Sequence, residues 1–130
     1  MTITHLNPDS LFRNPAFSQG TVIPAGSSIV IVGGQNGVGA DGQVVSGGIG
    51  QQTEQALRNV IDVLAEAGAT PDEVAKLTIY LVESVDLNEG FAATRAVWGD
   101  RPTAISGVFV RGLARPDCLV EIEAIAAISG

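Results

Sequence analysis

The stretch LVEIEAIAAI, residues 119–128, reads as a β-strand and decides the fold. Side chains alternate between the two faces of a strand, so Glu121 and Glu123 point to the same side. Apart from these two acids, both faces of the stretch are apolar. Such a strand predicts cover on both sides, which places it inside a layered fold.

The first half of the chain alternates between strand and helix patterns. The β-branched run SSIVIVGGQ, 27–35, stops at two glycines, which is typical of a strand ending in a turn or a bulge. The pairs NG at 36–37 and DG at 41–42 then predict a loop or hairpin. From Ile49 apolar residues recur at steps of three and four, which predicts a long amphipathic helix that closes near Gly68.

The second half continues the alternation. A capping pattern at 70–73, TPDE, predicts a short helical turn that leads into a strand over 75–83. Residues 85–99 predict a second, weaker helix that Gly90 interrupts. Two further strands are predicted at 103–110 and 118–128, joined by the turn RGLARPD.

The order strand, helix, strand, helix, strand, strand predicts an α+β or α/β layer fold. In it, two helices cover one face of a single sheet. At 130 residues the chain fits one domain, 1–130. The helices supply only one apolar layer, so we expect the other face of the sheet to pack against another subunit.

Bulk composition excludes several function classes. The net charge is −7 and the seven Lys and Arg residues form no basic run, so nucleic acid is not an expected partner. One histidine, His5, and one cysteine, Cys118, leave no metal-ligand cluster and no internal disulfide. Neither a signal-type N-terminus nor an apolar run of about 20 residues is present, so we expect a soluble, cytoplasmic protein with no membrane partner.

Two motifs are explained better by structure than by function. The run GVGADG, 37–42, has the spacing of a nucleotide-binding loop, but no helix opens on its third glycine and Asp41 would face a pyrophosphate, so it predicts a turn. A Ser/His/Asp or Cys/His catalytic set would depend on His5 alone, which lies far along the chain from Cys118. We interpret Cys118 and Trp98 as buried packing residues.

The remaining chemistry lies in the last strand. Glu121 and Glu123 have Cα atoms about 6–7 Å apart on one face, a spacing that suits paired acid/base work. On spacing alone, a solvated strand face is the favoured interpretation. Arg111 and Arg115, from the preceding turn, are also candidates to pair with the two acids.

A family resemblance adds to this. The run GQQTEQALRNVIDVLAEAGATPDEVAKLTIYLVESVDL, 50–87, is followed by Pro102 at the start of a strand and by LVEIEAIA near the end of the chain. Together they resemble the RidA family, also called YjgF or L-PSP-like, from about Phe17 to Ile128. The resemblance implies the chorismate-mutase-like α+β fold, with one mixed sheet, two helices on one face, and a homotrimer with clefts between subunits.

The resemblance also implies an activity that needs no cofactor: hydrolysis of enamines and imines to 2-keto acids and ammonia. The family's catalytic glutamate corresponds to Glu121, and its GQ pair to Gly34 and Gln35. Other positions depart from the family. Ala104 stands where an arginine grips the substrate carboxylate, and Phe17 stands where the family has a tyrosine.

Two further departures concern the same pocket. Gly33 replaces the family's serine, and Phe91 lies near the place of its asparagine. Because an alanine offers neither charge nor donor, a 2-imino acid would lose its main anchor. The turn before the last strand is about two residues longer than usual for the family, so Arg111 or Arg115 is a candidate substitute.

Three functions remain open. The first is a deaminase or other hydrolase of small imines, in which Glu121 orients water. The second is a non-catalytic trimer that binds a small metabolite. The third, the endoribonuclease activity attached to part of the family, is disfavoured by the acidic charge, because RNA phosphates need cationic partners.

Overall fold

The computed structural model describes residues 2–130. Its main sheet has the strand order β3-β6-β4-β5, in which β4 and β5 are parallel and the other neighbours antiparallel. The sheet is therefore mixed, and the α+β class with two helices is confirmed. The elements are β1 (Thr4–Leu6), β2 (Gly20–Val22), β3 (Ser27–Gln35), α1 (Ile49–Glu66), a 3₁₀ turn (Pro71–Glu73), β4 (Val74–Val82), α2 (Leu87–Trp98), β5 (Ala104–Val110) and β6 (Val120–Ser129).

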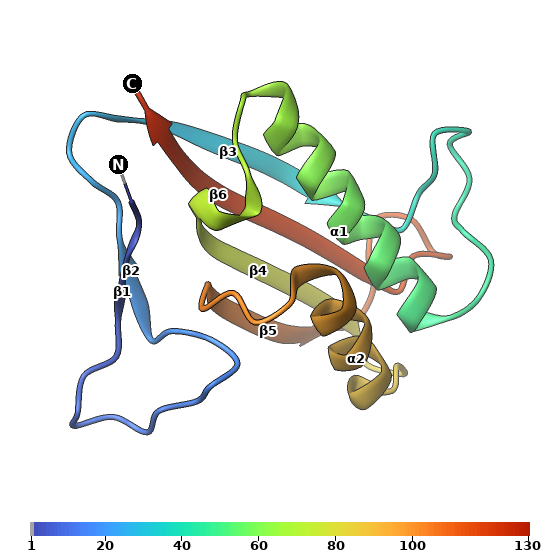
Figure 1. The fold of residues 1–130 in the computed structure, drawn as a ribbon. Helices are drawn as coiled ribbons and strands as arrows, with labels where there is room; N and C mark the ends of the chain where they lie inside the picture. Colours follow the sequence, from blue (N-terminus) through green and yellow to red (C-terminus); the bar gives the residue numbers. More distant parts are fainter. Residues whose placement is uncertain (1) are drawn as a thin grey trace.

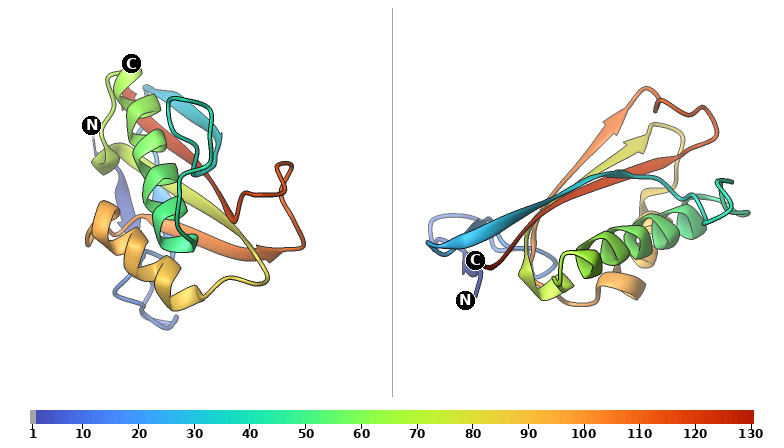
Figure 2. Two further views of the ribbon diagram at one scale, coloured as in Figure 1. Left: turned by 90° about the vertical axis from the view of Figure 1, so that its right-hand side faces the viewer. Right: turned by 90° about the horizontal axis from the view of Figure 1, so that it is seen from above.

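Both helices lie on the same face of the main sheet (Figure 1), and the view from above leaves the other face without a helix (Figure 2). The central strand β6 pairs with β3 on one side and β4 on the other. Its alternate residues Val120, Ile122, Ala124 and Ala126 are buried under the helices. Glu121 thus lies on the open face, as the alternation predicts.

The long helix α1 forms because its apolar residues share one stripe. Ala56, Leu57, Val60 and Leu64 are fully buried against the sheet. The helix ends before Gly68, whose φ of 78° is a left-handed conformation that glycine adopts without strain. The predicted helix and its stop are confirmed, as are the short turn at 71–73 and the strand that follows it.

The expectation that Gly90 interrupts the second helix is wrong. α2 is continuous from Leu87 to Trp98, and the side chain of Asp86 caps it by accepting from the backbone N–H of Asn88 at 2.9 Å. A Cβ at Gly90 would lie 3.6 Å from Ile49, so the glycine lies where α2 packs against α1. Gly90 is thus part of the contact between the two helices and does not break α2.

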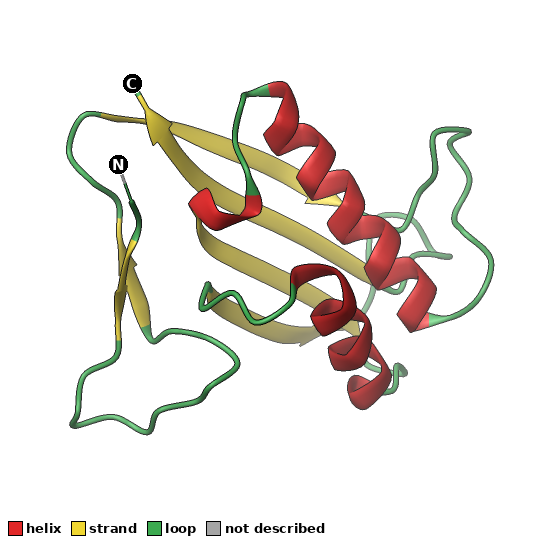
Figure 3. Ribbon diagram, in the orientation of Figure 1, coloured by secondary structure: helices red, strands yellow, loops and turns green. Residues whose placement is uncertain are grey.

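The sequence patterns missed a two-stranded hairpin at the N-terminus, coloured as strand in Figure 3. β1 and β2 have only three residues each, too few for a periodic pattern to be visible. The hairpin is tied to the main sheet through Thr21, whose Oγ1 donates to the carbonyl of Ala75 at 2.8 Å. It lies beside the ends of the main-sheet strands, next to the start of β4 (Figure 1).

The loop after β3 is the predicted turn region and not a nucleotide-binding loop. Val38 and Val44 form an antiparallel bridge, and Gly42 has a φ of 81°. α1 begins only at Ile49, so no helix opens on the third glycine of the run, Gly42. None of the helices in residues 2–130 has the length and apolar character needed to cross a membrane.

Trp98 and Cys118 are buried, as expected of packing residues. Burial, followed by the charge of Asp117, raises the pKa of the Cys118 thiol, so it is protonated at neutral pH. Trp98 donates its indole N–H to Oγ1 of Thr103 at 2.9 Å, a hydrogen bond between two buried side chains. This bond anchors the end of α2 to the segment that enters β5.

We expect Thr103→Val to reduce the free energy of unfolding by about 1–3 kcal/mol, because it leaves the buried indole N–H of Trp98 without a partner. Thr103→Ser keeps the hydroxyl and serves as the matched control, with a smaller loss. Urea unfolding followed by Trp98 fluorescence at fixed protein concentration measures both. Equal stability of the valine variant and the unaltered protein would contradict the assignment.

Candidate functional site

The open face of the main sheet carries both apolar and polar side chains. Ile29, Ile31 and Ile125 are exposed there, and Ile31 has 73% of its side chain accessible. On the same face lie Glu121 and Glu123, which confirms that the two acids share a side. An exposed apolar surface beside carboxylates is typical of an interface that encloses a polar site.

Glu121 lies against the backbone of Gly34. β3 has a register shift against β6 between Val32 and Gln35, which is a β-bulge at the predicted position. A Cβ built on Gly34 would overlap the carboxylate of Glu121. The bulge and the missing side chain together make room for the carboxylate, so Gly34 and Glu121 form one unit.

One amide side chain binds Glu121, a second binds the backbone just before β6, and the sequence patterns missed both. Asn36 donates to Oε1 of Glu121 at 3.3 Å and to the carbonyl of Val120 at 2.9 Å. Gln52, buried on α1, accepts from the N–H of Leu119 at 2.8 Å. Asn36 follows the Gly34-Gln35 pair directly, so a polar residue at that strand end was the available signal.

Glu123 has a different partner. Oε1 of Glu123 accepts from the hydroxyl of Tyr80 on β4 at 2.6 Å. This hydrogen bond, together with partial burial and the nearby negative charges, raises the pKa of Tyr80 above its usual value. The hydroxyl of Tyr80 therefore fixes the carboxylate of Glu123, which we interpret as a structural residue beside Glu121.

The arginines of the 111–117 turn do not pair with these acids. Arg115 makes an ion pair with Asp117 at 3.2 Å and donates to the carbonyl of Gly42 at 3.0 Å. Arg111 follows the end of β5 and is exposed. The interpretation that Arg111 or Arg115 neutralises Glu121 and Glu123 is wrong for the chain over residues 2–130, because no ion pair there joins them.

Ala104 lies in a second region of the open face. It begins β5 and lies directly opposite Lys76 on β4. The segment that follows Phe17 lies on the other side of β5, where Ser18 forms a parallel bridge with Ala104. These residues line a pocket of about 350 Å³, together with Ser106. The pocket is polar, and Lys76, the chain's single lysine, has no ion-pair partner within residues 2–130.

The structure thus brings the expected site residues together in two groups and not in one. Gly33, Gly34 and Gln35 lie with Glu121, whereas Phe17 lies with Ala104. Glu121 is in register with Tyr80, and Ala104 with Lys76, four residues earlier on the same strand. That offset corresponds to roughly 13 Å along β4.

No group of three or more His, Cys, Asp or Glu side chains within the described part of the chain is placed to hold a metal ion. His5 lies with its Nδ1 3.2 Å from Oγ of Ser18. The hydroxyl of Ser18 donates to the carbonyl of Pro102, which occupies its proton. This pair ties the N-terminal hairpin to the start of β5 and has no carboxylate partner.

The sequence matches the family described as Endoribonuclease L-PSP over residues 12–128. A RutC family protein of Pyrococcus abyssi is 33% identical over 100 residues, which cover 76% of this chain and 78% of that protein. The 2-iminobutanoate/2-iminopropanoate deaminase of Rattus norvegicus is 30% identical over 112 residues, 85% of this chain and 79% of the enzyme.

A solved structure extends the comparison to the fold. The Rid-family protein YyfB of Yersinia pestis superposes with a TM-score of 0.87 at 32% sequence identity, covering 98% of this chain and 100% of that one. The arrangement of two helices on a mixed sheet is therefore shared over nearly the whole length. The chorismate-mutase-like fold expected from the sequence is confirmed.

Tyr80 is the chain's single tyrosine, so a spectrophotometric titration at alkaline pH reports on it alone. We expect a pKa above the usual 10.0, and a value closer to 10.0 in Glu123→Gln, because the amide carries no charge to oppose the tyrosinate. Since the folded-state pKa is raised, the stabilisation is present below about pH 10 and is lost as the pH rises through that pKa. Glu83→Gln, at an exposed site after β4, is the control. An unshifted Tyr80 would contradict the hydrogen bond.

Proposed function

The chain belongs to the Endoribonuclease L-PSP family, the RidA/YjgF group, and from this premise we propose that it is a homotrimeric, cofactor-independent hydrolase of small enamines and imines. The observation that carries the proposal is the unit of Gly34, Asn36 and Glu121, in which a carboxylate is held on an open sheet face. A relative from rat is named as a 2-iminobutanoate/2-iminopropanoate deaminase, which supports the reaction class.

The two groups of site residues support a cleft shared between subunits. Glu121 and Ala104 lie on the two strands that flank β4, offset by roughly 13 Å along it, which is too far for one small molecule to contact both within one chain. A neighbouring copy packed on the open face would supply the second group. We propose that Glu121 of one subunit faces Phe17, Lys76 and Ala104 of the next.

In this cleft Glu121 orients the water that attacks the imine carbon. Asn36 occupies Oε1, so Oε2 accepts the proton from water while the new carbon–oxygen bond forms. That proton then passes to the imine nitrogen and gives a carbinolamine. The carboxylate next takes the proton of the new hydroxyl and delivers it to the amino nitrogen as the carbon–nitrogen bond breaks, so a keto acid and ammonia leave. An enamine enters the same route after it takes up a proton at carbon and becomes the imine.

Lys76 is the cation that remains where the family's arginine is missing. The register places it directly beside Ala104, and both line the same pocket. An ammonium is a point charge without the two-pronged geometry of a guanidinium, so it holds a carboxylate less firmly. We therefore propose that the substrate is gripped weakly, through Lys76, or is an imine without a carboxylate.

A metabolite-binding trimer without catalysis is the second candidate, and the replacement at Ala104 is the observation that favours it. The endoribonuclease alternative has less support, because the net charge of −7 repels RNA. The contacts of Arg115 with Asp117 and Gly42 weaken the proposal that Arg115 anchors a carboxylate, whereas Arg111, at an exposed position, stays a candidate.

We expect the protein in solution to have the mass of three 13.3 kDa chains by light scattering. Ile31→Asp should dissociate it, because an aspartate would be buried without a partner on the packed open face. Val63→Asp, an exposed apolar site on the helix side, is the matched control and should leave the assembly intact. A stable unaltered monomer at micromolar concentration would contradict the proposal.

The protein should release keto acid from 2-imino acids, generated in situ by an amino-acid oxidase, more slowly than a family member that has the arginine. The lost charge-assisted contact corresponds to roughly 30- to 1000-fold in rate at low substrate concentration. Ala104→Arg should recover part of that factor, and Glu121→Ala should abolish the recovered rate. An inactive Ala104→Arg variant that still forms a trimer would favour the metabolite-binding function.

The rate at which the unaltered protein releases keto acid can be used to test whether Lys76 binds the substrate carboxylate. We expect Lys76→Met to lower it by about 10-fold or more for substrates with a carboxylate, because the pocket then has no positive charge. Arg58→Met, on the exposed side of α1, is the control for loss of a distant cation. An unchanged rate in Lys76→Met would assign the carboxylate to another residue.

A further inference from the structure

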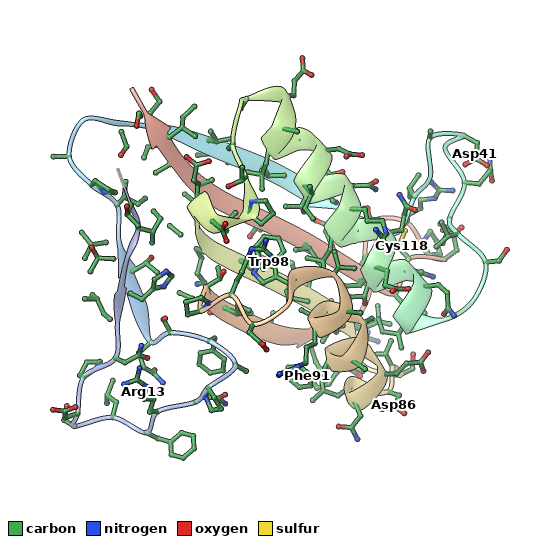
Figure 4. The ribbon with its side chains drawn as sticks, viewed as in Figure 1. Arg13, Asp41, Asp86, Phe91, Trp98 and Cys118 are labelled. Atoms are coloured by element: carbon green, nitrogen blue, oxygen red, sulfur yellow. The ribbon has the colours of Figure 1, made fainter. Side chains whose placement is uncertain are left out.

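A second, larger pocket lies on the opposite side of the sheet from Glu121. It has a volume of about 650 Å³ and is bounded by α2, the edge strand β5 and the loop at 14–17. Figure 4 shows two of its lining residues, Phe91 and Trp98, both on α2. Volumes of 300–1,000 Å³ are typical of small-molecule sites.

The walls of this pocket are mainly apolar and aromatic. Phe91 is 61% exposed and Phe109 is 52% exposed, although both belong to regular elements beside the core. Phe17, Trp98 and Leu87 are further members of the lining. Large apolar side chains left exposed around a concave surface are the usual mark of a ligand site.

One polar atom in the lining has no partner. Thr53 on α1 has 1% of its side chain exposed and lines the pocket, and its Oγ1 makes no hydrogen bond. It is the single buried side-chain N or O atom without a partner among residues 2–130. A helical threonine usually donates to the carbonyl four residues earlier, which Thr53 does not do.

The charges at the rim indicate a neutral ligand. Arg95 and Asp100 are the charged residues of the lining, and they pair with each other at 2.7 Å. Thr94 already donates to the carbonyl of Gly90 at 2.9 Å. The pocket therefore offers a ligand an apolar surface and one buried hydroxyl without a partner, and its two charged residues pair with each other.

We propose that this pocket binds a neutral aromatic small molecule with a single hydrogen-bonding group, and that the hydroxyl of Thr53 pairs with that group. The site is separate from the carboxylate site, since Glu121 faces the other side of the sheet. Phe17 and Ile105 line both this pocket and the smaller pocket beside Lys76. The proposal does not depend on any catalytic activity of the protein.

The test uses 2-naphthol and naphthalene as matched probes, because they differ only in the hydroxyl group. Binding is measured by calorimetry and by the emission of Trp98, the chain's single tryptophan, which lines the pocket. We expect one 2-naphthol per chain, and weaker binding of naphthalene. Glu121→Ala should bind 2-naphthol as the unaltered protein does, which separates this result from the outcome of the hydrolase assay.

Two variants locate the bound molecule. Thr53→Val keeps the shape of the side chain and should weaken 2-naphthol binding by roughly 2- to 10-fold while leaving naphthalene binding unchanged. Gly107→Leu should abolish binding of both probes, because Gly107 lines the pocket and a Cβ there meets no atom within 4 Å, so the leucine fills the cavity. Gly112→Leu, which also has room for a Cβ but does not line the pocket, is the control.

The Thr53→Val variant can also be tested without ligand, by its melting temperature. Because it removes a buried hydroxyl that has no partner, it should leave the melting temperature of the free protein unchanged or raise it. A lowered melting temperature would mean that the hydroxyl is already satisfied in the free protein and would overturn its assignment to a ligand. Absence of saturable 2-naphthol binding, or binding that Gly107→Leu leaves intact, would overturn the pocket itself.

Discussion

The structure depends on the position of β6 between β3 and β4, with one face dry and the other open. Because a strand alternates strictly, the burial of Val120, Ile122, Ala124 and Ala126 under the helices forces the intervening residues outward. A shift by one residue would bury two carboxylates and expose the core side chains. Packing of the helices therefore determines where Glu121 lies.

Placement of the carboxylate needs a second constraint, the close approach of the neighbouring strand. The β-bulge in β3 and the absence of a side chain at Gly34 let the carboxylate lie over the backbone. Asn36 and Gln52 then hold the loop and the start of β6 in register. Contacts from a strand, a loop and a helix thus restrict where this carboxylate can lie. A glutamate on a solvated surface has no such contacts.

The two faces of the sheet offer different chemistry. On the open face a pocket beside Lys76 is polar and carries an unpaired cation, whereas on the helix face the larger pocket is apolar and carries an unpaired hydroxyl. The first suits an anion and the second a neutral aromatic molecule. Phe17 lines both, so the loop that carries it is shared by the two pockets.

The sequence by itself determined the class of the fold, because the alternation in 119–128 and the helical period after Ile49 are set by which residues must avoid water. It also predicted that Glu121 and Glu123 share a face and that the strand before them in the chain ends at two glycines. It did not reveal the three-residue strands of the hairpin, the continuity of α2 through Gly90, the hydrogen bonds of Asn36 and Tyr80, or the position of Lys76 beside Ala104. These depend on contacts between residues distant in the chain, such as the 85 positions between Asn36 and Glu121. Local periodicity carries no information about such contacts, so only the tertiary structure decided them.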